Sequence, residues 1–276
     1  MDALLNHEIW LRLSFFFGIF ATVALWAWLA PRRTLRLPKY AHWRANLGII
    51  ALNPLTLRLF FPTAAIGLAL MGQAHGWGLL NNWDIPPTLA LIMGVILLDL
   101  AIYTQHVMFH TIPILWRLHR MHHADLDYDV TTGARFHPIE MLLSMGIKLA
   151  VIAALGPSAV AVLIFEVLLN ATAMFNHGNI HLPIPLDRLL RWLVVTPDMH
   201  RAHQAVQAPL ANSNFGVNLP WWDRLMGTYL AQPPEGHQQM PIGLETFRNP
   251  QITNTLPDML RLPFIHKIGA YPLNRR

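Results

Sequence analysis

Nine histidines stand in four short groups in the middle of the chain, and their spacing suits metal binding. Residues three or four apart on a helix have side chains on the same face, roughly 5 to 6 Å apart. Two imidazoles at that spacing can share one metal ion or serve two adjacent ions. The groups are His106 and His110; His119, His122 and His123; His177 and His181; and His200 and His203.

The number of these groups argues against a purely structural role. A single histidine is usually a packed or surface residue, but ten of the 15 histidines fall between His106 and His203. Nine imidazoles are too many for one ion, so the pattern predicts a site for two metals. The chain has no cysteine, which excludes thiolate ligands and iron–sulfur clusters. Imidazole suits iron, zinc, copper and nickel, so the ligand type alone does not select the metal.

Some polar residues near these groups are candidates to support the ligands. Carboxylates commonly accept the second ring N–H of a metal-binding histidine. Asp198, which precedes His200, and Asp223 are placed in the sequence to do so. His137 begins the segment His137-Pro138-Ile139-Glu140 and is expected to cap a helix, with metal ligation as the alternative.

Asp99 is a further candidate, because it shares a helical face with His106. The two residues are seven apart, about 10 Å along a helix axis, which is too far for a direct hydrogen bond. A bond to a neighbouring helix and a role in a channel are equally compatible with that position. The other histidines are expected at the surface: His7, His42, His75, His237 and His266.

The composition indicates a membrane protein. Of 276 residues, 54% are hydrophobic and 13% are charged, about half the charged share of an ordinary soluble domain. The formal net charge is +5, but the basic residues are scattered around apolar runs, which argues against nucleic-acid binding. A basic cluster from Arg32 to Arg44 follows the first apolar run and suits membrane anchoring.

Four apolar stretches could enter or cross a hydrocarbon core, which takes roughly 20 residues of helix. The last is interrupted by Gly156 and Pro157, so it is expected to form a helical hairpin whose halves do not span. The second stretch ends at Met71 or, if it is extended, at Leu80. The stretches are Ile9 to Ala30, Leu59 to Met71, Thr88 to His110 and Met141 to Met174.

The basic cluster predicts the orientation, because Lys and Arg favour cytoplasmic loops. It places the histidine groups and the C-terminus in the cytoplasm. We expect an all-α integral membrane protein whose helices carry a helical cytoplasmic cap, with the metal site at the junction. Its predicted regions are the membrane helices at 1–87, the histidine region at 88–230 and a C-terminal cytoplasmic tail at 231–276.

The histidine groups and the residues around them resemble the fatty acid hydroxylase/sterol desaturase superfamily. The resemblance covers about residues 90 to 230, whereas the first helices are family-like only in hydropathy. The histidine boxes that carry it are His106-x3-His110, His119-x2-His122-His123, His177-x3-His181 and His200-x2-His203. Three further segments are similar to family signatures: Asn176-His177-Gly178-Asn179, Asn214-Phe215-Gly216 and Trp222-Asp223-Arg224-Leu225-Met226-Gly227-Thr228.

The resemblance implies a di-iron enzyme that uses dioxygen, and electrons from a separate protein, to hydroxylate or desaturate a membrane lipid. Zinc is expected to replace iron during overexpression. The family's last box normally ends in two histidines, whereas the second position here is Gln204, whose amide oxygen either coordinates weakly or leaves the position to water. The implied ligands are therefore His106, His110, His119, His122, His123, His177, His181, His200 and His203.

Helical geometry predicts how these ligands divide between two metals. Adjacent residues diverge by about 100° around a helix, so His122 and His123 should serve different ions. The same reasoning aims Gln204 away from His203. The predicted sets are His106, His119, His122, His200 and His203 for one metal, and His110, His123, His177 and His181, with Gln204, for the other.

Two other functions fit parts of the pattern. A histidine-rich metal transporter would hold its ligands near mid-membrane, together with carboxylates. A non-catalytic relative would use the site only to bind metal or lipid, and Gln204 is the main argument for it. The sequence does not select among fatty acyl, sphingoid, sterol, carotenoid and ether lipids as substrates.

Overall fold

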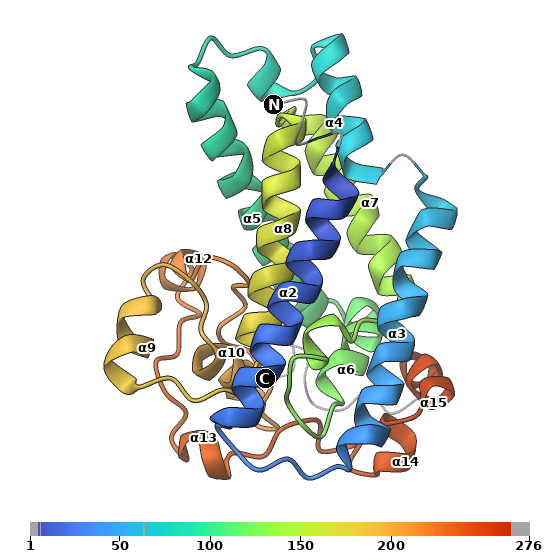
Figure 1. Ribbon diagram of the computed structural model, residues 1–276, viewed down its shortest axis with the longest axis vertical. Coiled ribbons are helices and arrows are strands. Elements are labelled where there is room, and N and C mark those ends of the chain that lie inside the picture. Colours follow the sequence, from blue (N-terminus) through green and yellow to red (C-terminus); the bar gives the residue numbers. More distant parts are fainter. Residues whose placement is uncertain (1–4, 6, 63, 266–276) are drawn as a thin grey trace.

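The computed structural model describes residues 5, 7–62 and 64–265, and within them the regular secondary structure is helical apart from two isolated β-bridges. Long helices run side by side in the upper part of Figure 1, and short helices form a cap at their lower end. The predicted all-α membrane fold is confirmed. The division at residues 87 and 230 stays a prediction.

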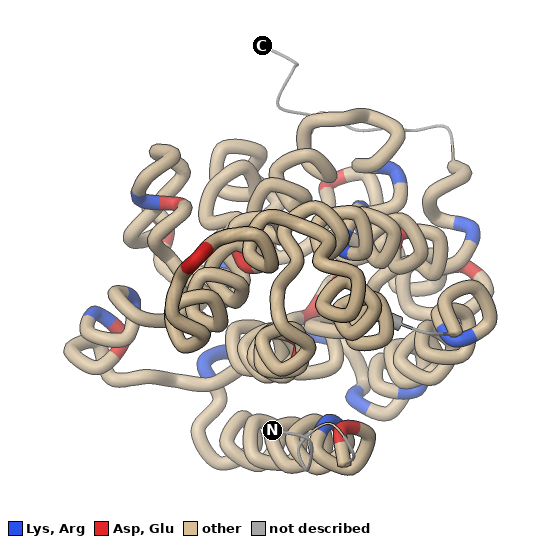
Figure 2. The backbone as a smooth tube through the Cα atoms, turned by 90° about the horizontal axis from the view of Figure 1, so that it is seen from above, with Lys and Arg blue, Asp and Glu red and all other residues tan. Residues whose placement is uncertain are grey.

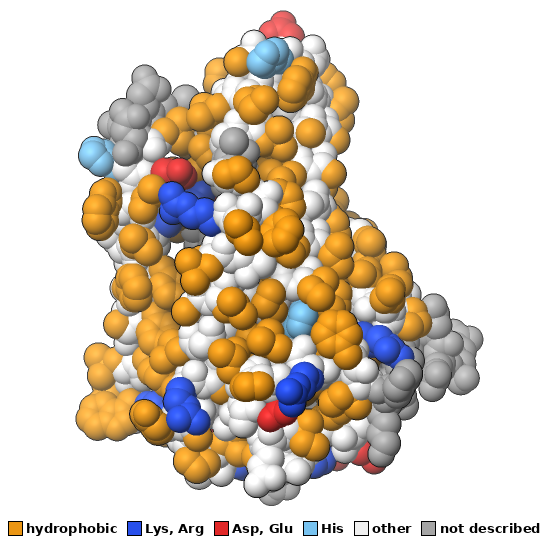
Figure 3. All heavy atoms as spheres, turned by 90° about the vertical axis from the view of Figure 1, so that its right-hand side faces the viewer, with side chains coloured by type: hydrophobic (Ala, Val, Ile, Leu, Met, Phe, Trp, Pro, Cys, Tyr) orange, Lys and Arg blue, Asp and Glu red, His pale blue; other side chains and the backbone are white. Residues whose placement is uncertain are grey.

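Within the described residues, five segments are long and apolar enough to cross a membrane. Figure 2, which looks down on the molecule from above, shows that most positions along the chain are neither acidic nor basic, and hydrophobic side chains dominate the upper part of the face in Figure 3. The segments are α2 (Glu8–Leu29); Lys39–Asn81, which contains α3 (Lys39–Phe60), α4 (Ala64–His75) and the 3-10 turn η1 (Leu79–Asn81); α5 (Pro87–Thr111); α7 (Pro138–Leu155); and α8 (Ala159–Asn176).

The second segment differs from the stretch predicted at Leu59 to Met71. Helix α3 already begins at Lys39, inside the basic cluster, and ends at Phe60; α4 begins at Ala64. Pro62 lies at this break, where a residue without an N–H cannot continue the helical ladder. The hydropathy pattern missed α3 because its first half mixes basic and apolar residues.

The hairpin of α7 and α8 also differs from its prediction. Gly156 ends α7 in the left-handed conformation (φ 63°), and the Ser158 side chain accepts a hydrogen bond from the Ala161 N–H at the start of α8. Each arm has 18 residues and is long and apolar enough to span, so the described part of the chain has five candidate membrane segments rather than four. The arms pack against α4 and α5.

The cap consists of short helices joined by loops. Its segments are α6 (Pro113–His123), η2 (Thr132–Ala134), α9 (Ile184–Leu190), α10 (Pro197–His203), α11 (Ala208–Ala211), α12 (Trp221–Leu225), α13 (Gly236–Gln239), α14 (Pro250–Thr253), α15 (Leu256–Arg261) and η3 (Leu262–Phe264). Helix α6 packs on α5 and η3, and α10 packs on the end of α8. The cap thus meets the bundle where the histidine groups lie.

Two of the five histidines expected at the surface are buried. His42 and His237 are 1% and 3% exposed, whereas His7 and His75 are exposed as predicted. His266 lies outside the described residues. Isolated histidines carry no periodic signal, so the sequence could not show that His42 bonds the carboxylate of Asp125.

Candidate metal centre

The first two histidine boxes of the sequence face each other across a corner between α5 and α6. His106 and His110 lie in the last two turns of α5. Ile112 is extended (φ −91°, ψ 117°) because it precedes Pro113, which begins α6. The bend brings the α6 histidines, His119, His122 and His123, against α5.

The other candidate ligands come from the end of α8 and from α10. His177 is the C-cap residue of α8. Helix α10 begins at Pro197. Its N-cap residue is Thr196, whose side chain accepts a hydrogen bond from the Met199 N–H. This seven-residue helix directs His200 and His203 into the centre.

Eight buried histidines form two adjacent groups. Within each group, one ring nitrogen per residue lies within 4.8 Å of the others. His119 and His122, whose ring centroids are 5.3 Å apart, join one group to the other. The five-histidine group is His106, His110, His119, His123 and His203, and the three-histidine group is His122, His177 and His200.

The structure divides the residues differently from the predicted sets. His122 and His123 lie in different groups, as expected for adjacent residues. His200 and His203 also separate, because the Nε2 atom of His200 lies 3.2 Å from that of His177 on α8. The approach of neighbouring helices, rather than spacing along one helix, thus determines each group.

His181 does not join either group. Helix α8 ends at Asn176, and the following chain is extended, with Ile180 in an antiparallel bridge to Pro31. The spacing of four residues therefore has no helical meaning here. The ring of His181 is exposed, while its backbone N–H donates to the Ala30 carbonyl.

Gln204 lies beside the three-histidine group. Its amide nitrogen is 2.6 Å from the Nε2 atom of His122, and its amide oxygen is buried without a hydrogen-bond partner among the described residues. Turning the amide over would exchange the two atoms, since N and O positions in a glutamine amide are interchangeable assignments. An acceptor oxygen can thus face this group, as a weak ligand would.

The five-histidine group fits a bound metal. The Nδ1 atoms of His106 and His203 donate to the carbonyls of Phe215 and Ser213, each at 2.7 Å. The Nδ1 atom of His119 donates to Glu140 Oε1, also at 2.7 Å. Their Nε2 atoms are buried without hydrogen-bond partners. Each ring therefore offers a lone pair, as metal-binding histidines do.

The three-histidine group shows a matching arrangement. The Nε2 atoms of His122 and His200 each lie 3.2 Å from that of His177. Two nitrogens bound at about 2.1 Å to one ion have a comparable separation. Burial lowers the pKa of His177 to about 4 and holds the pKa values of His122 and His200 well below 6.5. These imidazoles are therefore neutral near pH 7, the form that binds metals.

Glu140, rather than His137, supports a histidine of the centre. The His137 ring accepts a hydrogen bond from the Ile139 N–H at the start of α7, as predicted for a cap, and does not enter either group. Glu140 is 4% exposed and bonds His119. The sequence feature that could have identified Glu140 is its position as an acidic residue in the first turn of an apolar helix.

Asp223 acts on the centre through the backbone. It accepts hydrogen bonds from the N–H groups of Phe215 and Gly216, at 2.8 and 2.9 Å, and from Thr228 Oγ1. Phe215 in turn offers its carbonyl to His106. Asp223 thus connects two of the segments that resemble family signatures, and together they hold His106 of the five-histidine group in place.

Asp198 and Asp99 contact residues other than the grouped histidines. Asp198 accepts hydrogen bonds from Arg32 Nε, at 3.0 and 3.1 Å to its two oxygens, from Arg32 Nη2 at 3.0 Å, and from Arg201. This ties α10 to the segment after α2. Asp99 accepts hydrogen bonds from Trp222 Nε1 (2.8 Å) and the Leu219 N–H (3.3 Å), which anchors the cap to α5.

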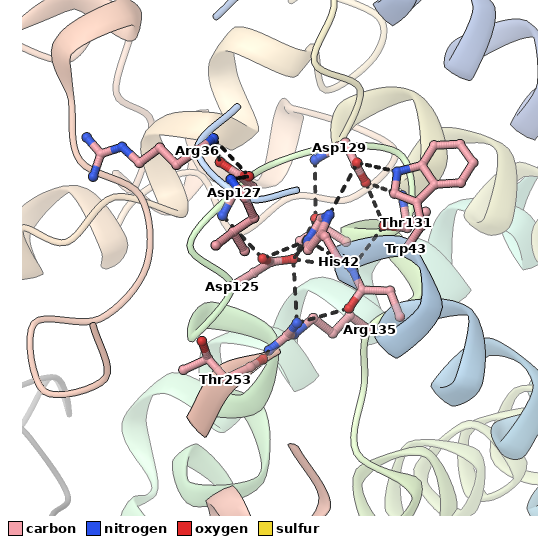
Figure 4. Close-up of polar contacts among 12 residues, drawn as sticks. Arg36, His42, Trp43, Asp125, Asp127, Asp129, Thr131, Arg135 and Thr253 are labelled. Carbon is pink, nitrogen blue, oxygen red and sulfur yellow. Dashed lines mark hydrogen bonds and ion pairs between the residues drawn. The ribbon is translucent and has the colours of Figure 1, made fainter. Parts of the chain in front are cut away.

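The loop after His123 is fixed by the buried polar network shown in Figure 4. His42 of α3 lies 2.9 Å from both oxygens of Asp125, and Trp43 donates to Asp129 at 2.7 Å. Burial alone would raise the pKa of the Asp125 carboxyl, but His42 and Arg135 hold it well below its usual value. The network positions the end of α6 against α3.

A cavity of about 890 Å³ joins the centre to the membrane helices. Histidines of both groups line one end of it: His106, His119, His122, His177 and His200. Most of its remaining wall is apolar. Phe15 and Phe17 of α2, and Leu47 of α3, line the cavity and are also exposed on the outside of the bundle. The cavity thus reaches the lipid-facing surface.

Several known proteins resemble this chain. It is 28% identical to the ornithine lipid hydroxylase OlsE of Rhizobium tropici over 63% of this chain and 51% of the relative. It is 27% identical to alkylglycerol monooxygenase of Xenopus tropicalis, over 78% of this chain and 45% of the relative. The human alkylglycerol monooxygenase is 28% identical, over 54% of this chain and 32% of the relative. The chain thus spans about half or less of the length of these relatives.

No solved structure matches the chain significantly. The family model described as fatty acid hydroxylase matches residues 91–228, which is half of the chain. That range contains every member of the two histidine groups, together with Glu140 and Asp223. The resemblance in the histidine boxes is therefore confirmed, and the chain belongs to the fatty acid hydroxylase family.

Proposed function

We propose that this protein is a dioxygen-dependent lipid hydroxylase that holds two iron ions in its two histidine groups. The observation that carries the proposal is that both groups line one largely apolar cavity, which reaches the lipid-facing surface of the bundle. Such a cavity suits a hydrocarbon chain. The relatives named as a hydroxylase and a monooxygenase favour hydroxylation over desaturation.

The bound irons would supply dioxygen activation and attack on an unactivated C–H bond. The chain's own residues position the reaction. Glu140 holds the Nδ1 proton of His119, and Asp223 holds the loop whose carbonyl orients His106. Phe136 stacks on His122 with ring centroids 4.5 Å apart and helps to exclude water from the cavity.

The metal content and the product test this function. Anaerobic purification followed by metal analysis is expected to give two irons per folded chain, with zinc replacing iron after overexpression. Mass spectrometry of host lipids, with and without the gene, is expected to show a hydroxylated lipid that depends on it. Well under one metal per folded chain, with every histidine intact, would contradict the di-iron proposal.

We also propose that the cap faces the cytoplasm and receives electrons from a separate protein. The basic residues between α2 and α3 support this orientation. A reporter fused after Arg276 should read as cytoplasmic, and a reading on the other side would contradict the orientation. Adding a candidate reductase to the purified protein should start product formation, whereas omitting it should not.

The geometry favours an enzyme over a metal transporter. A metal transporter would hold ligands near mid-membrane, whereas the two groups lie where the cap meets the bundle. Metal uptake by sealed vesicles, without oxygen consumption, would support transport instead. Retained lipid binding without an oxidised product, under reducing and aerobic conditions, would support a non-catalytic relative.

A further inference from the structure

The cavity contains an ionic cluster away from the histidines, formed by Arg12, Lys148 and Glu166. Glu166 of α8 accepts hydrogen bonds from Arg12 of α2 and Lys148 of α7, each at 2.5 Å. Glu166 and Lys148 lie near the middle of 18-residue membrane helices, and their side chains are 7% and 12% exposed. Ionisable residues at such depth are costly and usually mark a functional site.

The cations of the ionic cluster keep donors that Glu166 does not use. An ammonium group has three N–H donors, and the described hydrogen bond of Lys148 goes to Glu166. The Nε atom of Arg12 lies 3.4 Å from Glu8 but forms no hydrogen bond in the described structure. With Glu8, two acids balance two bases, and the two cations keep spare donors for an acceptor oxygen of a ligand.

Helix α7 links the ionic cluster to the metal centre along one face. Glu140, Ser144 and Lys148 are four residues apart, and all three line the cavity. Glu140 bonds His119, and Lys148 belongs to the cluster. Eight residues of helix rise about 12 Å. The cluster therefore lies at a fixed distance from the five-histidine group.

We propose that the ionic cluster binds an acceptor oxygen of the lipid substrate, while the alkyl segment next to that oxygen extends along α7 to the histidines. The donors sit on two cations, so a carboxylate is a better acceptor than a neutral ester oxygen. The separation between cluster and histidines then determines which carbon is attacked. This inference rests on the proposed function and adds a determinant of substrate and position.

Binding selectivity distinguishes this role from a structural clamp between α2, α7 and α8. A clamp would change stability when removed but would not tell an acid from its ester. The purified protein is titrated with a long-chain fatty acid and with its methyl ester, each competing against a fluorescent fatty acid. Wild type should bind the acid roughly tenfold more tightly, because the neutral ester oxygen accepts a weaker hydrogen bond from the cations than a carboxylate does.

Variants of α7 locate the selectivity. Lys148→Met should abolish most of the preference for the acid, and Lys148→Arg should restore it. Leu143→Met, on the lipid-exposed side of the same helix, is the matched control and should keep the preference. If Lys148→Met fails to fold, the double variant Lys148→Gln with Glu166→Gln removes the paired charges together. Equal binding of acid and ester by wild type, or unchanged selectivity in a folded variant, would overturn the proposal.

The product provides a second, separable test. In Lys148→Met the hydroxyl group should spread over more carbon positions than in wild type, as measured by fragmentation mass spectrometry. If wild type binds the acid selectively but oxidises no lipid, the proposed function fails and the ionic cluster keeps its role. If wild type oxidises lipid at one position but shows no selectivity, the role of the cluster fails and the function stands.

Discussion

The two histidine groups differ in how their rings are held. In the five-histidine group, His106, His119 and His203 each donate Nδ1–H to a carbonyl or carboxylate oxygen. In the three-histidine group only His177 does so, to Ala173 and Asn176, among the contacts described. The first group is therefore more completely oriented before metal binds.

The ligand sets differ as well. The three-histidine group has the Gln204 amide at the place where a further imidazole would complete it. An amide oxygen is a poorer donor than imidazole for iron or zinc. Ring support and ligand type thus point the same way, and we expect the five-histidine group to bind its metal more tightly.

Removing one ligand from each group should have the largest effect. His119→Ala and His122→Ala should each reduce lipid oxidation by more than about a hundredfold, since even residues that only support ligands cost 10- to 100-fold. Their metal contents should differ. His122→Ala should keep about one ion per chain, held by the five-histidine group. In His119→Ala it is the five-histidine group, the site expected to bind its metal more tightly, that is weakened. Equal metal loss in both folded variants would remove the distinction between the groups.

Removing the support of a ligand should have the next largest effect. Glu140→Gln keeps the size of the side chain but no longer offers a carboxylate to His119, so the metal affinity of the five-histidine group should fall about 10- to 100-fold. Competition with a chelator measures this. His137→Asn, which keeps a capping side chain on the same helix, is the control and should leave the affinity unchanged.

Adding a ligand at Gln204 should have a smaller effect in the opposite direction. Wild type should lose the metal of the three-histidine group first during titration with a chelator. Gln204→His should tighten that site by up to about tenfold, at the low end of the effects known for groups around a metal, without changing the other site. Two equal affinities that Gln204→His does not alter would contradict the asymmetry.

The sequence was most informative where function imposes a pattern. Spaced histidines, the missing cysteines and the apolar runs predicted an all-helical membrane protein with a histidine-rich site, and the break at Gly156 and Pro157 was visible in advance. Spacing could not predict which rings would meet, because His200 approaches His177 through the packing of α10 on α8. Glu140 was missed for a similar reason, since its partner lies 21 residues away.

The buried polar network of the loop after His123 also could not be predicted from the sequence. Asp125 and Asp129 look like ordinary loop acids, and His42 has no histidine at helical spacing. Their pairing joins segments 83 residues apart and depends on α3 beginning at Lys39. Periodicity reports contacts within a helix, whereas this network is made between elements.

His181 gives the smallest expected effect and tests the limit of such patterns. Its spacing from His177 matches a helical pair, but α8 ends at Asn176 and the next residues are extended, so neighbouring side chains alternate between faces. Ile180 is buried and His181 is exposed. We therefore expect His181→Ala to keep the metal content and lipid oxidation of wild type, while His177→Ala loses the metal of the three-histidine group. Loss of one ion in folded His181→Ala would show that the segment after α8 moves to bring this ring to the metal.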